Sequence, residues 1–183
     1  MTELHLGCGD NIKEGFLNID MRNDLKHPNF MGWDLSLGLP PLTGMDITGV
    51  HSEHFWEHLT ATEGRKLMLS CRDRLVRGGK FRIALPDFRK LATAYVNNDW
   101  SFFTDPGVLS FAPNHQMLEV INYALYQRQA DGFAEHKMMY DLPYMLFLLG
   151  YLGFKNPRED SFNPLYHLEG RRPYTFYAIA EAP

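Results

Sequence analysis

Two glycines and an acid near the amino terminus form the pattern with the clearest chemical meaning. Residues 3–7 are a short apolar stretch that runs into Gly7-Cys8-Gly9, and residues 16–20 are a second apolar stretch that ends at Asp20. Glycines let a backbone turn tightly and approach a ligand closely. A carboxylate at the end of the second strand can accept hydrogen bonds from both hydroxyls of a ribose. The spacing therefore predicts a site for a cofactor that contains a nucleoside.

The short connection between these two stretches narrows the choice of cofactor. A dinucleotide site needs a third glycine that opens a full helix, with the acid about 20 residues further on. Only one helical turn fits between Asp10 and Gly15. A pyrophosphate depends on the free N–H groups and the dipole of a true helix. S-adenosylmethionine has no phosphate, so the short connection favours it, although Gly-x-Gly is by itself also a common turn.

Composition limits the class of protein. The chain has 183 residues, which is typical of one domain, and a hydrophobic content of 45% argues against disorder. A net charge of −4 provides no basic surface for nucleic acid. No apolar run is long enough to span a membrane, and the sequence starts directly in a strand pattern without a signal peptide. The two cysteines predict neither a disulfide framework nor a metal pair. We expect a soluble, cytoplasmic protein.

Hydrophobic periodicity predicts strands separated by helices. The expected strands are at 3–7, 16–20, 30–35, 47–51, 80–85, 154–158 and 174–180, with helical stripes at 88–96, 117–125 and 142–150. A further helix is expected to begin at Thr60 or Thr62 and to stop at Gly78-Gly79. This order indicates an α/β fold with parallel strands, whose ligands lie at the carboxyl ends of the strands. Asp20, Asp34 and Asp87 fall at such ends.

Several segments together carry a family resemblance. HLGCGD, GFLNID, WDL, SEHFWEHL and LVRGGKFRIALPDF follow one another in the order found in class I S-adenosylmethionine-dependent methyltransferases. The chain most resembles a compact subgroup with a short loop between the first two strands, and EHKMMYD with LGYLGF resembles its carboxyl-terminal pattern. The resemblance implies a Rossmann-like fold with a mostly parallel sheet, an antiparallel C-terminal hairpin and a shortened first helix. It implies one domain over residues 1–183, with a helical insert at about 97–140 that covers the active-site edge.

The resemblance also implies which residues contact the cofactor. They are Gly7, Cys8 and Gly9 at the methionine end, Asp20 at the ribose, Met21, Asp34 and Leu35 at the adenine, and His51 and Ser52 beside the sulfonium. For some of the singled-out residues, a purely local structural role remains the alternative to a functional one. Asp20 would then cap a turn, Asp34 and Asp87 would cap helices, and Cys8 would be a small buried filler.

Methyl transfer to an oxygen would also need a general base. The candidates are His54, Asp87, His115 and His136. The aromatic insert suits a small-molecule or saccharide acceptor. A saccharide is what the resemblance implies, because the subgroup is associated with glycan pathways. The chain is expected to act as a monomer or homodimer, without nucleic acid, membrane or metal.

Two other functions stay open. The missing first helix favours a non-catalytic S-adenosylmethionine-binding protein or a partner subunit. In addition, His54-Phe-Trp-Glu57-His58 matches the inverted zinc-peptidase motif. On a helix, His54 and His58 would share a zinc ion and Glu57 would be the general base. The preferred interpretation needs no metal, because the methyltransferase resemblance already accounts for Glu57 and His58.

Overall fold

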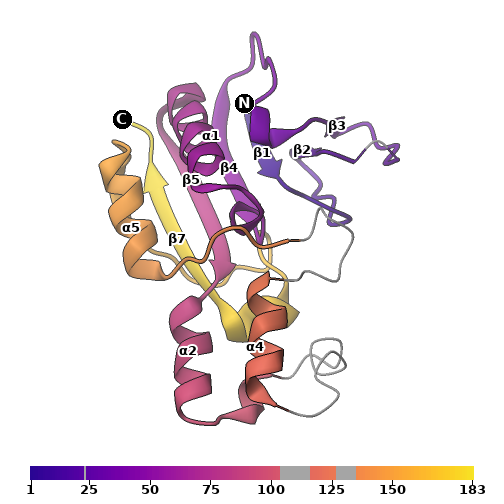
Figure 1. Cartoon of the computed structure of the whole chain (residues 1–183). Helices are drawn as coiled ribbons and strands as arrows, with labels where there is room; N and C mark the ends of the chain where they lie inside the picture. Colours follow the sequence, from indigo (N-terminus) through magenta and orange to yellow (C-terminus); the bar gives the residue numbers. More distant parts are fainter. Residues whose placement is uncertain (23, 104–115, 127–134) are drawn as a thin grey trace.

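The computed structural model describes residues 1–22, 24–103, 116–126 and 135–183, and its centre is a seven-stranded sheet with the order β3-β2-β1-β4-β5-β7-β6 (Figure 1). The strands are β1 Thr2–Leu6, β2 Phe16–Asp20, β3 Phe30–Gly32, β4 Ile47–Glu53, β5 Leu75–Pro86, β6 Lys155–Glu159 and β7 Thr175–Glu181. Strands β1 to β5 pair in parallel, whereas β7 runs antiparallel to β5 and β6. The expected parallel sheet with an antiparallel C-terminal hairpin is confirmed.

The helices divide into two groups. The α-helices are α1 Ala61–Arg74, α2 Phe88–Val96, α4 Met117–Tyr126 and α5 Leu142–Tyr151. Short 3-10 helices lie at η1 Leu35–Leu37, η2 Trp56–His58, η3 Trp100–Phe102 and η4 Glu169–Tyr174. Helices α1 and α5 lie against the sheet (Figure 1). Helices α2 and α4 form a separate small core with η3, beyond the carboxyl ends of the parallel strands. In the described residues no helix is both long and apolar enough to cross a membrane.

One face of the sheet is apolar because alternate strand residues point to it. Leu4 and Leu6 of β1 and Phe81 of β5 belong to this face and are fully buried. They pack with Leu67 of α1 and Met145 of α5 in one continuous core. This core fixes the strands whose carboxyl ends carry the candidate site.

The opposite face carries polar side chains, and no helix forms in residues 7–15 between β1 and β2 to cover it. His5 pairs in register with Asn18 on β2 and with His51 on β4, and His51 pairs with Arg82 on β5. Asn18 holds the short connection in place of a helix. Its Oδ1 accepts from the backbone N–H of Lys13 at 2.9 Å, and its Nδ2 donates to the Lys13 carbonyl at 3.0 Å.

The segment 160–174 covers this polar face. The Tyr166 ring lies 5.3 Å from the His51 ring, and the Arg82 guanidinium lies 4.5 Å from the Tyr166 ring. His167 is also buried, 5.4 Å from His51. The segment 160–174 therefore covers the polar face, as helices α1 and α5 cover the apolar face.

Several element boundaries differ from the sequence prediction, and two of the differences have a clear physical cause. Helix α1 ends at Arg74 rather than at Gly78-Gly79, since Leu75 is already paired with Ile47 in the sheet. Strand β3 ends at Gly32, because Asp34 caps the 3-10 turn η1 instead of extending the strand. The predicted helix start at Thr60 is confirmed, and Thr60 and Glu63 form a capping box.

Candidate functional site

The glycine turn after β1 has the conformation that a close-approach loop needs. Gly7 and Gly9 have φ angles of +64° and +51°, which non-glycine residues rarely adopt. The Gly7 N–H donates to the Ile19 carbonyl at 2.8 Å and holds the turn against β2. A Cβ on Gly7 would lie 2.3 Å from the Phe55 ring, whereas a Cβ on Gly9 would meet no atom within 4 Å. The turn is therefore packed at Gly7 and open at Gly9.

Asp20 lies directly beside this turn. Its Oδ2 accepts from the Gly9 N–H at 2.9 Å, and its Oδ1 accepts from the Arg22 N–H at 3.3 Å. An ionised carboxylate has about four acceptor positions, so these two contacts leave room for hydroxyl donors. The glycine turn and Asp20 thus lie side by side, and their binding of a cofactor stays a prediction.

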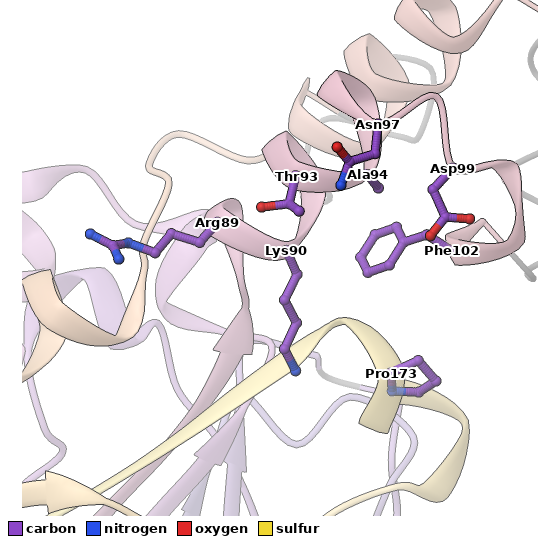
Figure 2. Close-up of a pocket in the computed structure, with 8 residues that line it drawn as sticks. All are labelled: Arg89, Lys90, Thr93, Ala94, Asn97, Asp99, Phe102 and Pro173. Atoms are coloured by element: carbon purple, nitrogen blue, oxygen red, sulfur yellow. The ribbon is translucent and has the colours of Figure 1, made fainter.

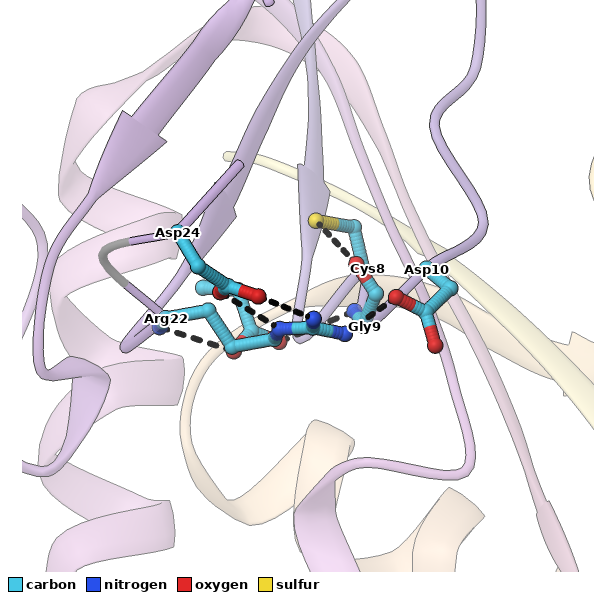
Figure 3. Close-up of polar contacts among 6 residues, drawn as sticks. Cys8, Gly9, Asp10, Arg22 and Asp24 are labelled. Atoms are coloured by element: carbon cyan, nitrogen blue, oxygen red, sulfur yellow. Dashed lines mark hydrogen bonds and ion pairs between the residues drawn. The ribbon is translucent and has the colours of Figure 1, made fainter. Parts of the chain in front are cut away.

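Arg22 joins the two loops that border the turn (Figure 3). Its guanidinium pairs with Asp10 after β1, and with Asp24 after β2 through Nε at 3.0 Å and Nη2 at 2.6 Å. Exposed ion pairs add little stability, so the contribution of Arg22 is mainly geometric. Sequence reasoning missed Arg22. The signal in the sequence was one acid after each of the parallel strands β1 and β2, Asp10 and Asp24, with a single arginine between the two acids.

The residues assigned to the adenine surround the ends of β2 and β3. The Trp33 N–H donates to the Asp20 carbonyl at 2.7 Å and brings the two strand ends together. Asp34 is exposed and caps η1 by accepting from the Ser36 N–H at 2.9 Å. Leu35 is buried, whereas Met21 is 44% exposed. The capping role of Asp34 is therefore present, and its contact with adenine stays a prediction.

Cys8 is a buried residue of the turn. It is 4% exposed, and its Sγ donates to the Gly9 carbonyl at 3.6 Å. Burial raises the pKa of the thiol to about 12. The side chain is therefore protonated at neutral pH, which fits a filler and not a nucleophile.

His51 and Ser52 are buried on opposite faces of β4. The His51 ring lies among the polar-face histidines, and burial lowers its pKa well below the ordinary value. The Ser52 hydroxyl accepts from the Trp56 indole N–H on the apolar face. The contact of these two residues with a cofactor stays a prediction.

Beyond β4, His54 and Glu57 form a buried polar pair. The Thr175 hydroxyl donates to the Arg171 carbonyl at 2.7 Å, so the His54 Nε2–H donates to Thr175 Oγ1 at 2.7 Å. This leaves the His54 Nδ1 lone pair 3.8 Å from Glu57 Oε1. Burial raises the pKa of Glu57 to about 8 and lowers that of His54 well below its ordinary value. Burial therefore disfavours the charged form of both groups.

The zinc-peptidase geometry expected for this motif does not form. His54 precedes the 3-10 turn η2 and has a φ angle of +54°, so His54 and His58 are not one turn apart on an α-helix. The His58 ring lies instead 4.9 Å from the ring of His136.

The remaining base candidates have different positions. Asp87 caps α2 by accepting from the Arg89 N–H at 3.0 Å, which is the local role considered for it. His136 lies at the end of β4 beside His58. His115 lies outside the described residues. The structure thus brings His54 and His136 to the surroundings of Glu57.

A cavity of about 410 Å³ lies between α2, η3 and the end of η4 (Figure 2). Its lining combines cations, an aromatic ring and small polar groups, namely Arg89, Lys90, Thr93, Ala94, Asn97, Asp99, Phe102 and Pro173. The Lys90 ammonium donates to the Thr175 carbonyl at 2.8 Å, and Arg89 pairs with Asp141. This cavity is lined by α2, η3 and η4 and by no residue of the glycine turn.

Comparison with known proteins identifies the class of fold. No family model and no curated protein sequence matches the chain. Solved structures do match, and they are S-adenosylmethionine-dependent methyltransferases. The fold of this protein is therefore the Rossmann-like methyltransferase fold.

Three of these structures cover nearly all of the chain. A methyltransferase from Archaeoglobus fulgidus is 18% identical, with a TM-score of 0.59 over 98% of this chain and 85% of its own. A chain from the Haloferax volcanii complex of the Trm112 methyltransferase activator with a protein described as a methyltransferase is 11% identical, with a TM-score of 0.59 over 100% and 82%. Magnesium protoporphyrin IX methyltransferase from Synechocystis PCC 6803, solved with S-adenosylhomocysteine, is 13% identical, with a TM-score of 0.53 over 100% and 74%.

Several other matched structures are longer chains, and this chain spans 46% to 50% of them. At such identities the likeness concerns the fold.

Proposed function

We propose that this protein is an S-adenosylmethionine-dependent methyltransferase that acts on a small-molecule or saccharide acceptor. The observation that carries the proposal is the hydrogen bond from the Gly9 N–H to Asp20 Oδ2 at 2.9 Å. It places a turn with open space above Gly9 next to a carboxylate with spare acceptor positions. These groups fit an adenosine, whose ribose offers two hydroxyl donors and no phosphate.

Within this site each part of the chain has a separate task. Asp20 accepts the ribose hydroxyls, the Gly7–Gly9 turn supports the amino-acid end, and the ends of β2 and β3 border the adenine. The bound sulfonium supplies an already activated methyl group. What remains for the protein is to align the acceptor and to exclude water. His54, Asp87, His115 and His136 stay candidate bases for an acceptor that must lose a proton.

The cavity beside α2 supports a hydroxylated acceptor. Phe102 offers a ring face for stacking, while Lys90, Asn97 and Asp99 offer donors and acceptors at the same cavity. An aromatic face with surrounding polar groups is suited to a sugar ring. We assign the acceptor to this side of the molecule.

Calorimetric titration with S-adenosylhomocysteine tests the cofactor assignment. We expect micromolar binding to the wild type and at least a tenfold loss for Asp20→Ala, since each lost charge-assisted hydrogen bond costs about 1.5–3 kcal/mol. Asp73→Ala is the matched control, because Asp73 is an exposed acid whose carboxylate pairs with Arg72 on α1. A thermal melt of each variant verifies folding. Absence of heat with the wild type, or equal affinity of both variants, would contradict the proposal.

A non-catalytic S-adenosylmethionine-binding subunit is the second candidate. The absence of a helix in residues 7–15 favours it, because that helix would offer backbone N–H groups to the cofactor carboxylate. One matched structure is itself a complex with a methyltransferase activator. The two functions separate in an assay of labelled methyl transfer to saccharide and small-molecule panels. Binding with no transfer to any acceptor would favour the non-catalytic protein.

A further inference from the structure

The segment around His136 is fixed to the 3-10 turn η2, which follows β4, by three hydrogen bonds. The backbone N–H groups of Lys137 and Met138 both donate to the Glu57 carbonyl, at 2.7 and 3.1 Å. The His58 Nδ1 donates to the Glu135 carbonyl at 3.3 Å. Although 78 residues separate His58 from His136, these bonds hold the two side chains in a defined arrangement.

The three side chains so assembled can converge on one point. One ligand atom from each of Glu57, His58 and His136 lies within 4.8 Å of the other two. The Glu57 side chain is 3% exposed, and neither of its oxygens has a hydrogen-bond partner among the described residues. A buried carboxylate without a partner is costly, so its position beside two imidazoles calls for a cation or a proton.

We propose that Glu57, His58 and His136 bind one divalent first-row transition-metal ion, with Zn²⁺ the best match. Two imidazole nitrogens and one carboxylate oxygen form a ligand set for zinc that leaves further coordination positions open. The site differs from the inverted peptidase motif. Glu57 is a ligand instead of a base, and His136, distant in sequence, replaces His54.

The orientation of His58 supports metal binding. Its Nδ1 carries the proton donated to the Glu135 carbonyl, which leaves the Nε2 lone pair for a metal. A backbone carbonyl behind the second nitrogen is the usual arrangement that fixes the tautomer of a metal-binding histidine. The ion would also compensate the charge of the buried Glu57 carboxylate.

The proposed metal site lies at the same edge of the sheet as the glycine turn, so a bound ion would contact a ligand held at that edge. Glu57 and His58 follow β4, which is the neighbour of β1 in the sheet. The open coordination positions would take an oxygen or nitrogen donor of a small molecule. That use rests on the proposed methyl transfer, whereas the binding of the ion does not.

Metal titration of chelator-treated protein tests the site. We expect the wild type to bind one equivalent of Zn²⁺ in calorimetry, and Co²⁺ to give visible absorption bands from nitrogen and oxygen ligands. His136→Ala and Glu57→Gln should each weaken Zn²⁺ binding at least tenfold, as loss of a direct ligand costs at least as much as loss of its supporting partner. His27→Ala is the control, because His27 is exposed and its Nδ1 accepts from the Asn29 N–H.

The outcomes are distinguishable. Binding that is lost in both ligand variants and kept in His27→Ala would establish the site. No binding by the folded wild type, or equal affinity in His136→Ala, would overturn it and leave Glu57 as a protonated partner of His54. His136 is only half-buried, so its variant tests the site even if Glu57→Gln does not fold. Titration with S-adenosylhomocysteine is independent of these results, so either proposal can fail alone.

Discussion

At the scale of single residues, the glycine turn has two different requirements for glycine. Gly9 is open, so only its backbone angle and a ligand constrain it. Gly7 has a structural requirement as well, because the Phe55 ring occupies the space of a Cβ. Sequence spacing identified both glycines but could not separate these reasons, since Phe55 lies 48 residues further along the chain.

Alanine substitution separates the two glycines. Gly9→Ala should lower the free energy of unfolding by about 1–2 kcal/mol, the cost of a left-handed backbone. Gly7→Ala should lose about 1–3 kcal/mol more, because its methyl group overlaps the Phe55 ring. Urea denaturation of both variants measures the difference. Equal losses would show that the Phe55 ring moves aside without cost, and Gly78→Ala, at a φ angle of +75° in open space, is a further reference.

At the scale of elements, helix α1 starts at one of its two predicted cap residues, whereas its predicted end is wrong. Helix α1 begins where its sequence places a capping residue, because a cap needs only local hydrogen bonds. Its end depends on Leu75, which pairs with Ile47 across the sheet. That pairing involves a residue 28 positions away, so the Gly78-Gly79 pair, a strong local stop, predicted the wrong boundary.

The start of α1 gives a second stability prediction. The Thr60 hydroxyl accepts from the Glu63 N–H, and the Glu63 carboxylate accepts from the Thr60 N–H at 2.8 Å. Thr60→Ala should therefore lower the free energy of unfolding by about 1 kcal/mol. Thr62→Ala, an exposed position inside α1, should be neutral or slightly stabilising, since alanine has the higher helix propensity. Chemical denaturation compares the two, and the opposite order would place the cap at Thr62.

At the scale of the whole molecule, the polar sheet face is the feature that sequence patterns did not predict. Each histidine is an ordinary polar residue in an alternating strand, and alternation alone predicts a solvent-exposed face. Residues 160–174 fold back over this face, so His5 and His51 are each 1% exposed. The covering segment 160–174, and not the strand of either histidine, removes the His5 and His51 side chains from water.

The buried histidines make stability depend on pH. Burial lowers the pKa of His5 to about 4, below its ordinary value of 6.5. The unfolded chain therefore binds a proton below pH 6.5 that the folded chain refuses until about pH 4. The stability contributed by neutral His5 is complete above pH 6.5 and is lost as pH falls toward 4. Each pH unit in that window costs about 1.4 kcal/mol.

Comparison of His5→Gln with the wild type isolates this contribution. Denaturation at pH 7.5, 6.0 and 5.0 should show the difference in unfolding free energy shrinking as pH falls, because glutamine does not titrate. The neighbouring ionisable groups, His51 on β4, Lys13 in the short connection and Arg171 in the covering segment, are present in both proteins. A pH-independent difference for His5→Gln would show that His5 titrates normally in the folded protein.

The sequence by itself determined the parallel α/β order, the glycine turn followed by Asp20, and a capped helix start at Thr60 or Thr62. All three follow from periodicity, φ preferences or hydrogen bonds between residues close in the chain. Only the tertiary structure decided that Arg22 joins two loops, that His51 is buried in a polar face, and that His136 meets Glu57 and His58. These contacts bring distant segments together, and their geometry depends on packing that no local pattern encodes.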